Sequence, residues 1–239
     1  EALLSELFGG HALVTPTTTL GHQITLPVLV SEKDALILDH QVHHSVQMAA
    51  TLARAAGARV ETVKHRELER AIDLAAALAR RHDTVWFAGD GVYSMYGDLA
   101  PVGLLRQLLD AAPNVRLYID DAHGMSWAGT HGRGSFLSRM PDPDRRVVLA
   151  TSLNKAFAAG GGVVVFPTRE ERERVRTTGA PLVFSGPVQP PMLGAALASA
   201  RIHLSDEIVG LQREYRDRAA LVNRLLREAA LPLLVENES

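Results

Sequence analysis

The sequence contains no cysteine, which excludes a disulfide scaffold, a thiolate metal site and a cysteine nucleophile. Its net charge is only −2, so no overall field draws the chain to nucleic acid or to an anionic membrane. The longest uncharged stretch, 177–200, is interrupted by prolines and glycines and is not a plain membrane helix. Lysine is also scarce, because only Lys33, Lys64 and Lys155 stand among the 25 basic residues. These absences favour a globular cytoplasmic protein in which any lysine chemistry uses one of three residues.

Short apolar runs rich in β-branched residues alternate with longer segments of helical periodicity. Several runs carry apolar residues at consecutive positions, as strands buried on both faces do. The alternation of strand and helix predicts an α/β protein with three layers, α/β/α, and a mainly parallel sheet. The expected strands are 35–38, 59–63, 84–88, 115–119, 147–150 and 163–166.

The helical pattern also predicts the domain organisation. Apolar residues at spacings of three and four predict a helix over 68–79. The segment 190–231 is continuously helical, and Pro232 ends it before a short apolar run that is typical of a strand. We therefore predict a major domain at 1–231 and the start of a smaller C-terminal domain at 232–239.

Polar segments follow four of the expected strands. In an open parallel sheet, ligands bind outside the carboxyl ends of the strands, so these segments form the candidate site. They are 43–45, 90–98, 120–123 and 151–155.

Lys155 is the candidate for covalent chemistry. It directly follows an apolar strand, whereas Lys33 and Lys64 lie in a polar turn and at a strand exit. Loss of water at the mouth of a sheet lowers the pKa of an amine and favours Schiff-base chemistry. A carboxylate at the neighbouring strand end, Asp120 or Asp121, would then hold a pyridinium nitrogen, as in pyridoxal-phosphate sites.

Other polar residues have simpler interpretations. The segment 40–44 contains three histidines, but no glutamate-bearing motif accompanies them, so we predict no metal site. Three consecutive glycines at 160–162 precede a strand instead of opening a helix, which argues against a nucleotide loop. The histidines interpreted as ordinary surface or core residues are His11, His65, His82 and His203.

Two longer motifs belong to the segments that follow strands. Segment 120–124 reads Asp-Asp-Ala-His-Gly, and 129–134 reads Gly-Thr-His-Gly-Arg-Gly. Segment 90–101 reads Asp-Gly-Val-Tyr-Ser-Met-Tyr-Gly-Asp-Leu-Ala-Pro. With these motifs the chain resembles the α-oxoamine synthase family of fold-type I pyridoxal-phosphate enzymes, nearly throughout its length. The resemblance implies the major domain of the pyridoxal-phosphate transferase fold and a homodimer, and we expect the apolar stretch 182–193 in its interface.

The resemblance implies pyridoxal 5′-phosphate as the cofactor and assigns roles to single residues. Lys155 is implied as the Schiff-base lysine, Asp120 as the partner of the pyridine nitrogen and His123 as a hydrogen-bond partner of the phenolic oxygen. His43 corresponds to the histidine that stacks on the pyridine ring, and Asp121 to a turn residue whose side chain points away. The other implied cofactor contacts are Ser152, Thr18 and Thr19 near the phosphate and Ser94 close to the cofactor.

The chain departs from the family pattern at several positions. Val42 replaces an asparagine before the stacking histidine, and Asp90 replaces a glutamate. Asn154 replaces the small residue before the lysine, and Thr18 replaces a glycine of the phosphate turn. Gly186 stands where the family often has a threonine that reaches the phosphate of the partner subunit. These changes leave the cofactor expected and bear on the choice of substrates.

The activity that the resemblance implies is a decarboxylative condensation. An amino acid would react with an acyl thioester, carried by coenzyme A or an acyl carrier protein, to give an α-amino ketone. An aminotransferase or another pyridoxal-phosphate enzyme would use the same lysine and aspartate and is an alternative. A catalytically silent homologue that serves as an interaction module is another. The third alternative is a metal hydrolase built on Asp120, Asp121 and His123.

Overall fold

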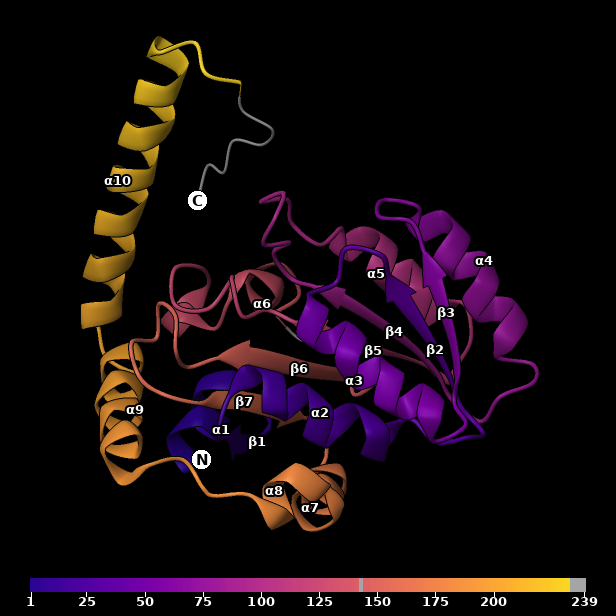
Figure 1. Cartoon of the computed structure of the whole chain (residues 1–239). Coiled ribbons are helices and arrows are strands. Elements are labelled where there is room, and N and C mark those ends of the chain that lie inside the picture. Colours follow the sequence, from indigo (N-terminus) through magenta and orange to yellow (C-terminus); the bar gives the residue numbers. More distant parts are fainter. Residues whose placement is uncertain (142–143, 233–239) are drawn as a thin grey trace.

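A seven-stranded sheet runs through the computed structural model of the chain, which describes residues 1–141 and 144–232 (Figure 1). Its strand order is β1-β7-β6-β5-β4-β2-β3. Strands β2 to β6 are parallel to one another, whereas β7 is antiparallel to both β6 and β1. The strands are β1 (His11–Thr15), β2 (Ala35–Asp39), β3 (Arg59–Val63), β4 (Val85–Asp90), β5 (Val115–Asp120), β6 (Val147–Ser152) and β7 (Gly162–Phe166).

The predicted three-layer fold with a mainly parallel sheet is confirmed, with one strand more than expected. The six expected strands are all present, but β1 was missed. Its five residues begin with the exposed His11 and include only three apolar side chains, too short a pattern to separate from a loop. Pairing with β7, in register from His11 opposite Phe166 to Thr15 opposite Gly162, makes this segment a strand.

Apolar side chains of the central strands alternate between the two faces of the sheet. In β2, Ala35 and Ile37 belong to one hydrophobic cluster, while Leu36 and Leu38 belong to the other. The first cluster includes residues of α1 (Ala2–Phe8), α4 (Leu68–Leu78), α5 (Val102–Asp110) and α9 (Pro190–His203). The second includes residues of α2 (Thr18–Leu29), α3 (His44–Ala55) and α7 (Arg169–Thr178). Both faces of the sheet are therefore covered, which explains the consecutive apolar residues of its strands.

The helices follow the expected periodicity, with two differences. The structure ends the predicted helix over 68–79 at Leu78 and breaks the segment 190–231 at Leu204–Asp206. Ser205 causes part of this break, because its Oγ accepts a hydrogen bond from the backbone N–H of Glu207 at 3.3 Å. The helices are α1 (Ala2–Phe8), α2 (Thr18–Leu29), α3 (His44–Ala55), α4 (Leu68–Leu78), α5 (Val102–Asp110), α6 (Ser135–Arg139), α7 (Arg169–Thr178), α8 (Ala180–Phe184), α9 (Pro190–His203) and α10 (Glu207–Glu228).

Helix α10 extends away from the sheet, and most of its apolar side chains are exposed (Figure 1). Only Ile208 and Gln212 near its start are buried. The predicted start of a second domain at 232–239 lies, from residue 233 onward, outside the described residues. Within the described residues, no helix combines the length and apolarity needed to cross a membrane.

Candidate active site

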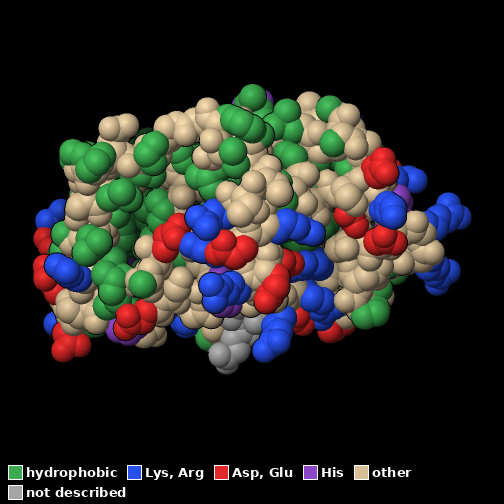
Figure 2. All heavy atoms as spheres, turned by 90° about the horizontal axis from the view of Figure 1, so that it is seen from below, with side chains coloured by type: hydrophobic (Ala, Val, Ile, Leu, Met, Phe, Trp, Pro, Cys, Tyr) green, Lys and Arg blue, Asp and Glu red, His purple; other side chains and the backbone are tan. Residues whose placement is uncertain are grey.

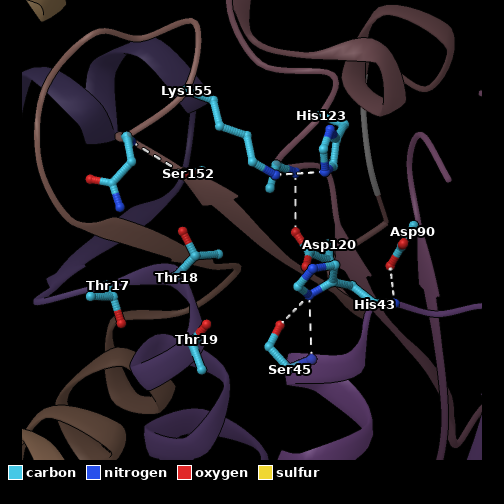
Figure 3. Close-up of a pocket in the computed structure, with 12 residues that line it drawn as sticks. Thr17, Thr18, Thr19, His43, Ser45, Asp90, Asp120, His123, Ser152 and Lys155 are labelled. Atoms are coloured by element: carbon cyan, nitrogen blue, oxygen red, sulfur yellow. Dashed lines mark hydrogen bonds between the residues drawn. The ribbon is translucent and has the colours of Figure 1, made fainter. Parts of the chain in front are cut away.

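A cavity of about 200 Å³ lies at the carboxyl ends of the parallel strands (Figure 3). Asp90 at the end of β4 stands opposite Asp120 at the end of β5, and Asp120 stands opposite Ala150 of β6. The sheet register thus brings together segments that are far apart in the sequence. The lining residues are Thr17, Thr18, Thr19, His43, Ser45, Asp90, Asp120, Ala122, His123, Ser152, Asn154 and Lys155.

Lys155 enters the cavity from the loop that joins β6 to β7. Its Nζ lies 2.6 Å from Nε2 of His123, although the lysine side chain as a whole is exposed. Burial of the amine lowers the pKa of Lys155, against the opposing effects of Asp120 and Asp90. Burial, followed by the charge of Lys155, also lowers the pKa of His123. Both shifts favour the uncharged bases, which can accept a proton or form a bond to carbon.

The loop that carries Lys155 is closed by the residue before it. Oδ1 of Asn154 accepts a hydrogen bond from the backbone N–H of Gly161 at 2.8 Å. The backbone N–H of Leu153 donates to the carbonyl of the same glycine at 3.0 Å. Asn154, a departure from the family pattern, therefore fixes the base of the lysine loop.

Asp120 is almost completely buried at the end of β5, and both of its oxygens have partners. Oδ1 accepts a hydrogen bond from the backbone N–H of Ala122 at 3.0 Å, and Oδ2 lies 2.9 Å from Nε2 of His22. Burial by itself would raise the pKa of Asp120, but His22, this backbone bond and His43 together hold it below its usual value. The cavity therefore contains a buried, ionised carboxylate. His22 is not among the predicted site residues; its signal is the spacing of one helical turn from Thr18 on α2.

Asp121 points away from the cavity, as alternation along a strand predicts. Its Oδ2 accepts a hydrogen bond from the backbone N–H of Phe136 at 2.8 Å. A Cβ atom at Gly91 or Gly124 would lie 2.1 or 2.2 Å from its Oδ1, so these positions admit no side chain. Burial raises the pKa of Asp121 to about 7. The two neighbouring aspartates therefore have opposite environments and opposite charge preferences.

His43 stands between β2 and α3. Its Nδ1 lies 2.6 Å from Oγ of Ser45, and its backbone N–H donates to Oδ1 of Asp90 at 3.1 Å. Burial lowers the pKa of His43. Burial and the charge of Asp120 raise the pKa of Asp90 to about 9, so this carboxyl group is protonated near neutral pH. Figure 3 shows His43 and Asp90 at the cavity wall formed by β2 and β4.

The N-terminus of α2 forms the opposite wall and fits an anion such as a phosphate group. Oγ1 of Thr17 caps the helix by accepting from the backbone N–H of Leu20 at 3.0 Å. Oγ1 of Thr18 is buried and has no hydrogen-bond partner among the described residues. Ser152 is buried too, and its Oγ accepts from the backbone N–H of Asn154 at 3.2 Å, which leaves its own proton free to donate. An orphaned hydroxyl, free amides of a first helical turn and the helix dipole all favour a bound anion here.

Outside the cavity, a hydrogen-bonded network supports the turn that leads to His43. Nδ1 of His65 lies 3.1 Å from both carboxylate oxygens of Asp39, and its Nε2 lies 2.8 Å from Oδ2 of Asp98. The hydroxyl of Tyr93 donates to Oδ2 of Asp39 at 3.0 Å. His65 is thus a structural histidine, as its sequence interpretation proposed.

The structure places the predicted site residues in two groups. Lys155, Asp120, His123, His43, Ser152, Thr18 and Thr19 all line the one cavity. Ser94 lies outside that set, exposed in the turn that follows β4.

A family model described as aminotransferase class I and II matches residues 3–238. Among curated proteins, the 8-amino-7-oxononanoate synthase of Dechloromonas aromatica is 33% identical over 188 residues, which are 79% of this chain and 47% of that protein. The protein of the same name from Maricaulis maris is 31% identical over 245 residues, 100% of this chain and 60% of its own length. The chain thus spans about half of the length of the curated relatives that it matches.

Solved structures of serine palmitoyltransferases share the fold of this chain. A serine palmitoyltransferase from Sphingomonas wittichii is 27% identical with a TM-score of 0.81, and the match covers 100% of this chain and 58% of that one. A second serine palmitoyltransferase, from S. paucimobilis with PLP and myriocin bound, has a TM-score of 0.84 at 23% identity over 100% of this chain and 60% of its own. The predicted resemblance to the α-oxoamine synthases is confirmed.

Proposed function

Because the chain belongs to the aminotransferase class I and II family, we propose that it forms the cofactor-binding part of a pyridoxal-phosphate-dependent acyltransferase. The proposed reaction joins an amino acid to an acyl thioester with loss of carbon dioxide and yields an α-amino ketone. One observation carries the proposal: the Lys155 amine, in the loop after β6, and the buried Asp120 carboxylate, at the end of the adjacent β5, line the same cavity. The names of the curated relatives favour acyl transfer over the other reactions of the family.

The residues that line the cavity would have different roles in the reaction. Bound pyridoxal phosphate would supply an electron sink for negative charge that develops on the α-carbon of the amino acid. Asp120 would bind the ring nitrogen and keep it protonated, and the wall at Thr17–Thr19 would bind the phosphate. Nζ of Lys155 would bind the cofactor covalently, and the amino group of the substrate would then displace it from the cofactor. The freed lysine amine would accept the α-proton and later return it. His123, 2.6 Å from that Nζ, would orient the amine toward the reacting carbon.

We also propose that the protein acts as a homodimer and takes its acyl group from coenzyme A or an acyl carrier protein in the cytoplasm. Several apolar side chains in and near α8 and α9 are strongly exposed, including Phe184 at 86% and Val183 at 49%. Figure 2 shows hydrophobic side chains gathered in one part of that face, beside a separate group of charged ones. Such a patch favours an interface with a second copy. A dimer of this kind would bury more than about 2,000 Å² in total.

Reduction and peptide mapping test the covalent site. The purified protein is incubated with pyridoxal 5′-phosphate, reduced with borohydride and digested. We expect the pyridoxyl label on Lys155, with Lys33 and Lys64 as internal controls. A label on either control lysine would refute the site assignment.

A substrate screen tests the reaction. Amino acids that shift the visible spectrum of the loaded protein are combined with acyl thioesters, and release of carbon dioxide and free thiol is measured. Both products are expected for a condensation. Formation of a keto acid without carbon dioxide would indicate an aminotransferase, and a spectral shift without any product would indicate a silent homologue.

A further inference from the structure

His22 lies on α2, in a helical layer that covers one face of the sheet, and contacts two residues of β5. Its side chain is 0% exposed, and its two ring nitrogens contact different partners. Nε2 lies 2.9 Å from Oδ2 of Asp120, and Nδ1 lies 2.8 Å from the hydroxyl of Tyr118. Tyr118 and Asp120 are two positions apart on the strand and so point to the same face. The three side chains form a buried row, joined by one hydrogen bond and one short polar contact, that ends at the cavity.

The direction of the protons in this row follows from its chemistry. An ionised Asp120 can only accept, so Nε2 of His22 carries the proton that faces it, whatever the state of Nδ1. Burial raises the pKa of Tyr118 well above its usual value, so this hydroxyl keeps its proton. A protonated Tyr118 can donate to Nδ1, and that bond selects the ring tautomer in which the proton is on Nε2, the nitrogen that contacts Asp120.

The contact with His22 also explains how the buried Asp120 carboxylate can stay charged. Asp120 is buried beside Asp90, and a carboxylate in that position without a compensating donor would take up a proton instead of staying charged. The backbone N–H of Ala122 satisfies only Oδ1. His22 is the side chain that supports the other oxygen.

We propose that His22 is a positioning residue: it holds Asp120 ionised and oriented toward the ring nitrogen of the cofactor, and Tyr118 fixes its tautomer. This inference rests on the proposed function, since it concerns how the same cavity recognises pyridoxal phosphate. His22 itself does not line the cavity, so its effect on the cofactor passes through Asp120.

The test compares two cofactors that differ only at the ring nitrogen. Dissociation constants are measured for pyridoxal 5′-phosphate and for its deaza analogue, in which carbon replaces that nitrogen. The proteins are the unmodified chain, His22→Leu, His22→Asn and Tyr118→Phe. For His22→Leu we expect pyridoxal phosphate to bind roughly 10- to 100-fold more weakly, the usual effect of losing a hydrogen bond to a charged group. Binding of the deaza analogue should change by less than about threefold, because it offers Asp120 no ring nitrogen.

The other variants separate positioning from packing. His22→Asn keeps a donor and should recover part of the affinity for pyridoxal phosphate, while Tyr118→Phe should show a smaller loss than His22→Leu, again for this cofactor alone. His203→Leu is the matched control, because His203 is also buried but lies outside the cavity. It should leave the ratio of the two dissociation constants unchanged.

Two outcomes would overturn this inference alone, and a third would refute the proposed function as well. Equal weakening of both cofactors in His22→Leu would mean that His22 only maintains packing. An unchanged ratio in both His22→Leu and Tyr118→Phe would mean that Asp120 does not depend on the row. If the unmodified protein binds neither cofactor, the proposed function itself is refuted, and this inference with it.

Discussion

Replacing each of the two adjacent aspartates by asparagine should have very different effects on catalysis. Asp120 is 4% exposed, lies 2.9 Å from Nε2 of His22 and faces the cavity. Asp121 is 1% exposed, but its carboxyl group accepts from the backbone N–H of Phe136 on the other side of the strand. The substitutions remove a buried charge in the first case and a group that favours its neutral form in the second.

The expected magnitudes follow from this difference. Removing one partner of a buried charge pair costs about 3–5 kcal/mol. If the full cost falls on the transition state, Asp120→Asn lowers kcat by about 10²–10⁴-fold. Asp121→Asn removes no charge that faces the cofactor and should lower kcat by about tenfold or less.

The assay measures kcat for both variants with saturating pyridoxal phosphate, so that weak cofactor binding is not mistaken for slow chemistry. Far-UV circular dichroism and thermal unfolding confirm that each variant is folded. Equal losses, or a larger loss for Asp121→Asn, would refute the assignment of the two side chains to opposite faces of β5.

Three further predictions concern the lysine, the second aspartate and the exposed patch. Lys155→Ala should abolish turnover while the protein still binds the cofactor noncovalently, whereas Lys33→Ala should retain activity; turnover by the first variant would contradict the proposed role. The pKa of Asp121 rises from 3.8 to about 7 on folding, so the folded state holds a proton that the unfolded state releases, and the free energy of unfolding should fall as pH rises through this window. Urea unfolding should show a weaker fall in Asp121→Asn, and an unchanged slope would count against the shift. Light scattering should find a dimer in the intact protein and a larger monomer fraction in Phe184→Asp, and an active monomer would refute the dimer.

The fold could largely be predicted because its strands carry a strong local signal. β2, β4 and β5 are buried on both faces, so their apolar residues are consecutive and conspicuous in the sequence. β1 has no such signal, since its strand character comes from pairing with β7 and not from its own composition. The break between α9 and α10 was missed for a related reason: the apolar periodicity continues across Leu204–Asp206, while hydrogen bonds of Ser205 interrupt the helix.

The candidate site could be predicted where residues follow strands. Asp120 and Lys155 stand directly at or after the ends of β5 and β6, and rules for parallel sheets place such residues together. His22 could not be found in this way, because it lies within a helix and reaches Asp120 only through the packing of α2 against the sheet. The raised pKa of Asp90 likewise depends on Asp120, which meets it only through the strand register.

The position of β1 at the edge of the sheet has a consequence for biosynthesis. Thr17–Thr19, the anion-binding wall, directly follow β1, and β1 acquires its ladder of hydrogen bonds only from Gly162–Phe166. A ribosome synthesises the chain from its N-terminus, so β1 must wait for β7 before it can join the sheet. Such a long-range pairing is intrinsically slow. The wall at Thr17–Thr19 is therefore completed only after β7 has been made, and a nascent chain that ends before Phe166 should not retain the cofactor.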